Sequence, residues 1–132
     1  RDAEGYMGRL RCVQEISAVT AACMMVKTSV FKAVGGFDEE LKVAFNDIDL
    51  CMKVRKYGVK IVFTPYAELY HYESKSRGME DTPEKQLRFS REVNCFRRKW
   101  ERELLKGDPY YNPNLTLNNT DCSLRKQEKN GD

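Results

Sequence analysis

Hydrophobic residues recur at helical spacing in the last third of the chain. The stripe consists of Phe89, Val93, Phe96, Trp100 and Leu104. Its intervals of four, three, four and four residues put all five side chains on one side of an α-helix. That apolar side is expected to pack against another part of the protein. Thr82-Pro83-Glu84 just upstream supplies a capping hydroxyl, a proline suited to the first helical position and an acid in the first turn. The pattern predicts a helix over residues 83–105.

Two shorter helices are predicted upstream from their end signals. A hydroxyl residue can cap a helix near residues 29–34, which the Gly35-Gly36 pair would end in the left-handed conformation. A second amphipathic segment predicts a helix over about residues 47–57, closed by Gly58.

Three segments predict strands between these helices. Residues 14–27 are mostly small and apolar, which favours a buried strand, although their Ala and Met residues leave a helix open. Residues 59–63 and 67–72 are rich in β-branched and aromatic residues, and Pro65 separates them. Strands that alternate with helices place the chain in the α/β class.

Composition narrows the class of protein. The 132 residues suffice for one domain, and a hydrophobic content of 41% supports a real core. A net charge of +3 does not indicate a nucleic-acid binder, and no apolar run approaches the roughly 20 residues that span a bilayer. The five cysteines are odd in number and lack paired spacing, so they favour small buried hydrophobes in a reducing cytoplasm over a zinc site or disulfides.

The predicted C-terminal helix is basic, and the chain changes character after it. Residues 84–106 hold eight Lys or Arg against four Glu. A solvated basic face is the favoured interpretation, and contact with anionic lipid headgroups or a polyphosphate ligand is the alternative. Residues 107–132 contain prolines and asparagines without a period, which predicts an extended tail with a disordered end. The predicted division is therefore residues 1–106 and this tail.

Polar residues gather where the second helix should begin. Asp47 and Asp49 lie where free backbone N–H groups and the helix dipole favour an ionised carboxylate, so one can cap the helix while the other faces a cleft. Gly35-Gly36 permits a close backbone approach to a ligand. His71 is the only histidine and ends a predicted strand, although a structural role is the commoner fate of such a residue.

Read in order, the segment "VTAACMMVKTSVFKAVGGFDEELKVAFNDIDLCMKVRKYGVKIVFTPYAELYHYESKS" resembles the acceptor-side half of the family 2 glycosyltransferases. These are inverting enzymes with the GT-A fold, and the similarity is strongest to the bacterial branch that makes rhamnose-rich cell-surface polysaccharides. The resemblance implies the C-terminal half of a GT-A (nucleotide-diphospho-sugar transferase) domain. That half would be a mixed sheet with flanking helices and a long C-terminal helix.

The resemblance also implies roles for individual residues. The "NDIDL" segment places the catalytic base on Asp47, and Asp49 would order the start of the helix. The "GGFDE" segment would line the acceptor pocket through Gly35, Gly36, Asp38 and Glu39. His71 would help to hold the Mg²⁺ or Mn²⁺ that neutralises the departing diphosphate. The implied partners are a nucleotide-sugar donor and a glycan acceptor, with no nucleic acid.

The sequence departs from the family pattern at two positions and lacks the segment that would bind the nucleotide. Asn46 and Lys53 stand where relatives usually carry an acid and an arginine. The nucleotide-binding half would precede residue 19, so we expect a fragment that is inactive alone and binds metal weakly. Such a fragment would self-associate through its uncovered face and would work in the cytoplasm, at the inner face of the membrane if the basic helix binds lipid. The alternative is a non-catalytic glycan-binding or interaction module of the same fold.

Overall fold

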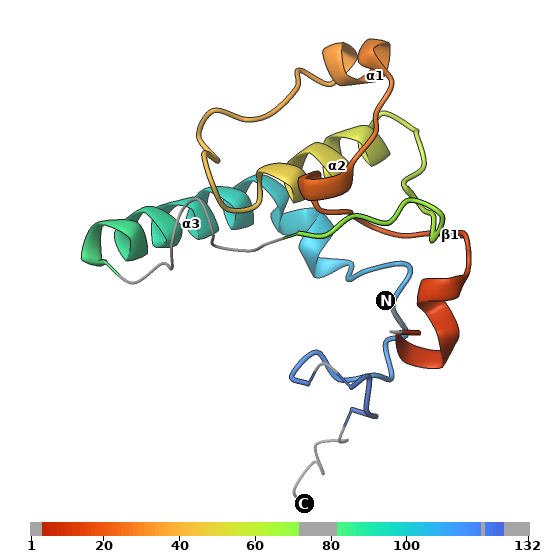
Figure 1. The fold of residues 1–132 in the computed structure, drawn as a ribbon. Helices are drawn as coiled ribbons and strands as arrows, with labels where there is room; N and C mark the ends of the chain where they lie inside the picture. The colour runs from red at the N-terminus through yellow and green to blue at the C-terminus, as the bar shows by residue number, and fades with distance from the viewer. Residues whose placement is uncertain (1–3, 72–81, 120, 126–132) are drawn as a thin grey trace, which may run out of the picture.

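The computed structural model describes residues 4–71, 82–119 and 121–125. Its elements in chain order are η1 (Tyr6–Arg11), β1 (Gln14–Glu15), η2 (Ala21–Cys23), α1 (Thr28–Ala33), α2 (Asn46–Lys56), β2 (Val62–Phe63) and α3 (Pro83–Leu105), where η marks a short 3₁₀ helix. In Figure 1, α2 lies along α3, α1 stands on the far side of α2, and the C-terminal segment runs away from the end of α3.

The three predicted helices are confirmed, because their signals are local. Thr82 caps α3 by accepting a hydrogen bond from the amide of Lys85 at 3.4 Å. Gly35 and Gly36 follow α1 with φ values of 79° and 63°. The Gly36 amide donates to the carbonyl of Phe31 at 2.9 Å, which closes the helix in the left-handed conformation.

The predicted strands are wrong in extent. β1 and β2 form a two-residue antiparallel pair in which Gln14 lies opposite Phe63. The rest of residues 14–27 forms no strand and contains η2, and residues 67–71 form none either, while Tyr72 lies outside the described residues. A strand needs a hydrogen-bonded neighbour, and no further one is supplied within the described residues. They therefore give an α/β arrangement with a small antiparallel sheet, not the mixed sheet that was expected.

The core lies between α2 and α3. Its buried members are Leu41, Phe96 and Trp100, and Phe45, Ile48, Met52 and Cys95 pack against them. The predicted hydrophobic stripe is buried only in its middle, since Phe89 and Leu104 at its ends are 44% and 45% exposed. The packing of α2 on α3 is what places the polar residues of α2 beside those of α3.

The chain after α3 contacts the sheet and folds back on itself. The Tyr110 hydroxyl donates to Glu15 at 3.0 Å, which ties this segment to β1. Further along, Leu115 and Leu124 form an isolated antiparallel bridge. Residues 126–132, where the disordered end was predicted, lie outside the described residues.

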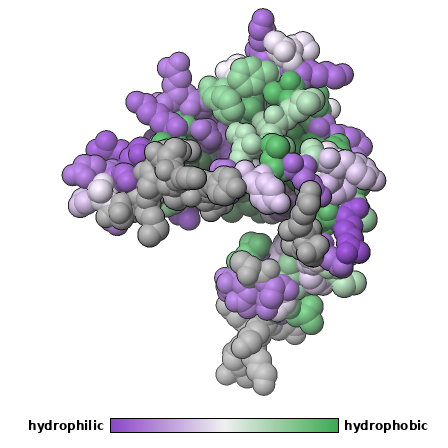
Figure 2. Space-filling view, viewed as in Figure 1, coloured by the Kyte–Doolittle hydropathy of each residue, from purple (hydrophilic) through white to green (hydrophobic). Residues whose placement is uncertain are grey.

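Apolar residues are also exposed on the surface. Figure 2 shows hydrophobic residues gathered in the upper part of the face viewed, and Met25 is 99% exposed. Near the sheet, Tyr66, Leu69 and Tyr70 are exposed as well. Self-association through such a face stays a prediction. Among the residues described, no helix is long and apolar enough to cross a bilayer.

Candidate functional site

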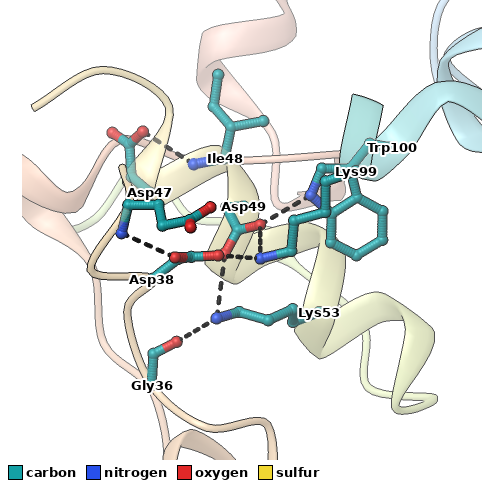
Figure 3. A network of polar contacts seen from close by, with 9 residues as sticks. Gly36, Asp38, Asp47, Ile48, Asp49, Lys53, Lys99 and Trp100 are labelled. Atoms are coloured by element: carbon teal, nitrogen blue, oxygen red, sulfur yellow. Dashed lines mark hydrogen bonds and ion pairs between the residues drawn. The ribbon is translucent and has the colours of Figure 1, made fainter. Parts of the chain in front are cut away.

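The most buried charged group in the described chain is the carboxylate of Asp49, in the first turns of α2. Its side chain is fully buried. The indole Nε1 of Trp100 donates to its Oδ1 at 2.8 Å, and the Lys99 Nζ lies 2.8 Å from the same oxygen. The Lys53 Nζ lies 3.1 Å from Oδ2 as an ion pair (Figure 3). Two helices thus supply the partners of one carboxylate.

Helical spacing explains how these partners meet. Lys53 follows Asp49 by four residues, so the two side chains lie on one face of α2. Trp100 belongs to the buried stripe of α3, and its indole N–H requires an acceptor once the ring is buried. A buried carboxylate is tolerated only when it is paired and hydrogen-bonded. Trp100 and Lys99 meet that need at Oδ1, whereas Oδ2 accepts no hydrogen bond and has only the ion pair with Lys53.

The same two lysines also hold the loop that follows α1. Lys53 donates to the backbone carbonyl of Gly36, and Lys99 pairs with the carboxylate of Asp38. Asp38 in turn accepts the Glu40 amide at 2.9 Å. We call Gly36, Asp38, Asp49, Lys53, Lys99 and Trp100 the Asp49 network.

The electrostatics of the network favour an ionised pair between Asp38 and Lys99. The hydrogen bond from Lys99, followed by that from the Glu40 amide, lowers the pKa of Asp38 below its ordinary value. Burial lowers the pKa of Lys99, but its hydrogen bonds to Asp38 and Asp49 outweigh burial and leave that pKa raised. Both shifts favour the charged forms of Asp38 and Lys99, which strengthens the contact between the loop and α3.

Asp47 has a different environment from Asp49. It is half-buried, and in Figure 3 its carboxylate points away from Lys53 and Lys99. Its Oδ1 accepts the Ile48 amide at 2.8 Å, and its Oδ2 accepts the Ala21 amide of η2 at 3.2 Å. The residue that caps α2 is Phe45, which makes no side-chain capping bond. Asp47 therefore touches the helix start without being its cap.

The backbone two residues before Asp47 is strained. Phe45 has φ 64° and ψ 3°, a left-handed conformation that costs a bulky residue about 1–3 kcal/mol. Its ring stacks on Phe96 with centroids 5.0 Å apart and also contacts Phe89 at 6.0 Å. The aromatic contacts with α3 hold this turn in place, so α3 also fixes the direction in which α2 begins.

The remaining predicted site residues are dispersed. Gly36 is buried, whereas Gly35 and Glu39 are exposed beside it. His71 is exposed at the edge of the described range. Lys53 and Lys99 link Gly36 and Asp38 to Asp49. The structure shows no contact between His71 and Asp47. No three His, Cys, Asp or Glu side chains within residues 4–71, 82–119 and 121–125 are grouped to hold a metal ion.

Sequence reasoning missed three contributors to this region. Lys99 was read as part of a solvated face, and Trp100 only as a core residue. Glu92, 3% exposed, accepts the Ala44 amide at 2.7 Å and so fastens the loop before α2. One signal in the sequence could have indicated these contacts. A buried Trp100 indole N–H needs an acceptor, and a buried Asp49 carboxylate needs donors, so the two could have been expected to meet.

A cleft of about 710 Å³ lies beside this region. Its floor is largely apolar and includes Phe96, Met52 and Leu104, with Arg55 and Lys56 at its edge. None of the residues that the sequence marked for catalysis, acceptor binding or metal binding lines it. Ile48, the residue after Asp47, does line the cleft, so the cleft lies next to the start of α2 without including the Asp47 side chain.

Similarity to known proteins covers most of the chain. An uncharacterized protein of Sinorhizobium fredii is 58% identical over 121 residues, 91% of this chain. The O-antigen biosynthesis protein RfbC of Myxococcus xanthus is 39% identical over 115 residues, 87% of this chain. An N-acetylglucosaminyl-diphospho-decaprenol L-rhamnosyltransferase of Mycobacterium tuberculosis is 36% identical over 62 residues, 47% of this chain.

These relatives are much longer than the chain, which spans 13%, 9% and 20% of their respective lengths. No protein-family model and no solved structure matches it. The names of the second and third relatives nevertheless point in one direction, because both concern the assembly of surface glycans or the transfer of a sugar. The chain is therefore related to glycosyltransferase-related proteins of cell-surface polysaccharide synthesis.

Proposed function

We propose that the chain is the acceptor-side part of an inverting family 2 glycosyltransferase with the GT-A fold. It moves a sugar from a nucleotide-sugar to a glycan acceptor during cell-surface polysaccharide synthesis. The observation that carries this proposal is the 39% identity to the O-antigen biosynthesis protein over 115 residues, a stretch that spans nearly the whole chain. The exposed arginines of α3 support a position at the inner face of the membrane.

Asp47 is the residue to which we assign proton transfer. Its carboxylate has about four acceptor positions, of which the amides of Ile48 and Ala21 use two. The half-buried side chain can therefore still accept a hydrogen bond from an acceptor sugar hydroxyl. Asp49 cannot take this role, because its carboxylate is fully buried among Lys53, Lys99 and Trp100.

The proposed step is a single displacement. The acceptor hydroxyl oxygen forms a bond to the anomeric carbon of the donor while the bond from that carbon to the diphosphate breaks. The nucleoside diphosphate leaves with the electron pair, and Asp47 takes the hydroxyl proton. Attack opposite the leaving group inverts the anomeric configuration.

The described residues do not fit a metal site. His71 is exposed, and no group of three candidate ligands surrounds it within the described chain. A divalent ion in the longer enzyme would need ligands from elsewhere, with His71 contributing at most one. The mechanism proposed here therefore assigns no step to a metal ion.

Asp47→Asn in the complete natural chain that carries these residues tests the proposal. Asparagine keeps the size of the side chain but only one acceptor oxygen, so one of the two amide contacts, with Ile48 or Ala21, is lost. Because Asp47 is half-buried, water can replace that contact and the fold should survive. Because the amide cannot take up the proton, turnover with donor and acceptor should fall by on the order of 10²–10⁴-fold. Donor affinity should stay unchanged, and NMR of the parent's product should show the inverted anomer.

Glu101→Gln is the matched control, since it removes one exposed carboxylate from α3. Turnover in that variant should equal that of the parent. If Asp47→Asn also transferred sugar at the parent's rate, Asp47 would not be the base. If the parent bound glycan without any transfer, the non-catalytic module of the same fold would be the better description.

A further inference from the structure

Three segments far apart in sequence meet at the Lys99 ammonium. It contacts Asp38 in the loop after α1 and Asp49 in α2, and it is itself carried by α3. A single side chain thus connects the loop of the proposed acceptor pocket with the helix that presents Asp47. Of the residues in Figure 3, only Lys99 reaches the carboxylates of both segments.

The neighbouring residue reinforces this arrangement. The Trp100 indole donates to the same Oδ1 atom of Asp49, and the ring is 4% exposed. At Trp100 the backbone of α3 leaves the helical region, with φ −114° and ψ 18°. The bend of α3 therefore lies at the position where the side chains of Lys99 and Trp100 contact Asp49.

Asp38 is engaged by this contact and is not a free acceptor ligand. Its Oδ2 pairs with Lys99 and its Oδ1 accepts the Glu40 amide. The carbonyl of Gly36 is likewise taken by Lys53. The Gly36 carbonyl and the Asp38 carboxylate are thus both used in contacts that fix the loop.

We propose that Lys99 is a positioning residue that fixes the loop of residues 36–41 against the start of α2, and with it the geometry between Asp47 and a bound acceptor. The inference rests on the proposed function for its catalytic consequence, although its structural part stands independently. Lys99 touches no reacting atom in this scheme. Its effect passes through Asp38 and Asp49.

Lys99→Met tests the structural part by amide hydrogen exchange in the complete natural chain. The amides of Glu40 and Leu41 report on the loop, because both donate to Asp38, one to the side chain and one to the carbonyl. Loss of a charge-assisted contact should speed their exchange by about tenfold or more. The Gln86 amide at the start of α3 should keep its rate.

The matched control is Lys60→Met, which removes an ammonium group that also pairs with a carboxylate, but on the surface. It should leave the Glu40 and Leu41 amides at the parent's rate. Equal acceleration at Gln86 and Glu40 in Lys99→Met would show a general loss of stability and would overturn the proposal. Unchanged exchange at Glu40 would overturn it as well.

A second variant covers the case in which Lys99→Met fails to fold. Asp38→Asn removes the loop's charge, and its side chain is only part-buried at 22% exposure, so folding should persist. The same two loop amides should exchange faster, because Lys99 then has a neutral partner in place of a carboxylate. Parent-like protection of Leu41 in Asp38→Asn would contradict the role of the contact.

Turnover tests the catalytic part. In Lys99→Met the kcat for transfer should fall by roughly 10- to 100-fold, the scale expected for a misplaced catalytic geometry, while the KM for the nucleotide-sugar stays within about twofold. A parent-like kcat beside a loosened loop would overturn the catalytic part. If the parent transfers no sugar, the proposed function fails, and the exchange rates still decide whether Lys99 positions the loop.

Discussion

Two clusters of charged and polar residues in this molecule use similar groups in different surroundings. The Asp49 network joins two carboxylates, two lysines and an indole around the fully buried Asp49 carboxylate, where α2, α3 and the loop after α1 meet. The second, which we call the Glu15 cluster, joins Glu15, Lys60 and Tyr110 at the edge of the sheet, with Arg55 over the tyrosine ring.

Burial separates the two clusters. The Asp49 side chain is fully buried, whereas those of Glu15 and Lys60 are 36% and 72% exposed. Water and salt screen the exposed pair, so its contribution to stability is small. Within the Asp49 network the loss of a buried partner removes contacts that water cannot fully replace, which costs more stability. The ion pairs of this chain should therefore be ranked by exposure before they are ranked by distance.

The largest effect is expected for Asp49→Ala. The change removes the group that both lysines and the Trp100 indole share, and it leaves their donors without their carboxylate. The free energy of unfolding should fall by about 3–5 kcal/mol. Urea unfolding followed by circular dichroism measures this loss, and a fall below about 1 kcal/mol would remove the distinction between the clusters.

A smaller effect is expected for Trp100→Phe. This variant keeps most of the buried aromatic surface but loses the hydrogen bond to Asp49, while Lys99 still pairs with that carboxylate. Unfolding free energy should fall by about 1–3 kcal/mol. Leu104→Ala, at the exposed end of the same stripe, is the control and should change the urea midpoint less. A larger loss in the control would show that stripe packing, and not the indole bond, dominates.

The smallest effect on stability is expected for Glu15→Gln. The dependence of this effect on salt further distinguishes the Glu15 cluster from the Asp49 network. Hydrogen bonds from Lys60 and then Tyr110 lower the pKa of Glu15, so this stabilisation is present above the ordinary Glu pKa and fades as pH falls through the lowered value. The pKa of Lys60 is raised by the same contact, so the pair also fades as pH rises through the raised Lys60 value.

Thermal unfolding at pH 7 in low and in roughly 1 M salt measures this prediction. High salt screens exposed charges within about 3 Å, so the melting temperatures of Glu15→Gln and of the parent should converge. The deficit of Asp49→Ala should persist under the same conditions, because the Asp49 carboxylate itself is fully buried and salt screens a buried charge much less. A deficit for Glu15→Gln that survives high salt would show that the Glu15 cluster is not a surface cluster in energetic terms.

Two of the helix ends of this fold were predictable because their signals are local. The hydroxyl and proline at Thr82-Pro83 begin α3, and the Gly35-Gly36 pair ends α1, without help from any distant residue. The strands were not predictable to the same extent. Whether residues 16–20 or 67–71 extend the sheet depends on a neighbouring strand, and a side-chain pattern does not supply one.

Some of the residues of the candidate site were predictable from the sequence, but the contacts between them were not. Local sequence singled out Asp47 and Asp49, and only the structure separates a half-buried carboxylate facing η2 from a buried one facing α3. Lys99 could not be distinguished from the other cations of α3, because its role arises from the angle at which α3 crosses α2. The catalytic assignment of Asp47 and the metal role of His71 stay predictions.

The sequence separation within the Asp49 network has a consequence for the order of folding. Trp100 and Asp49 are 51 positions apart, so their contact closes a long loop whose entropy must be lost before the contact forms. Until α3 docks, the Asp49 carboxylate stays in water. We expect this contact to form after the rate-limiting barrier, so that Asp49→Ala speeds unfolding and leaves the folding rate almost unchanged. The start of α2 would then be the last part of the molecule to reach its final geometry.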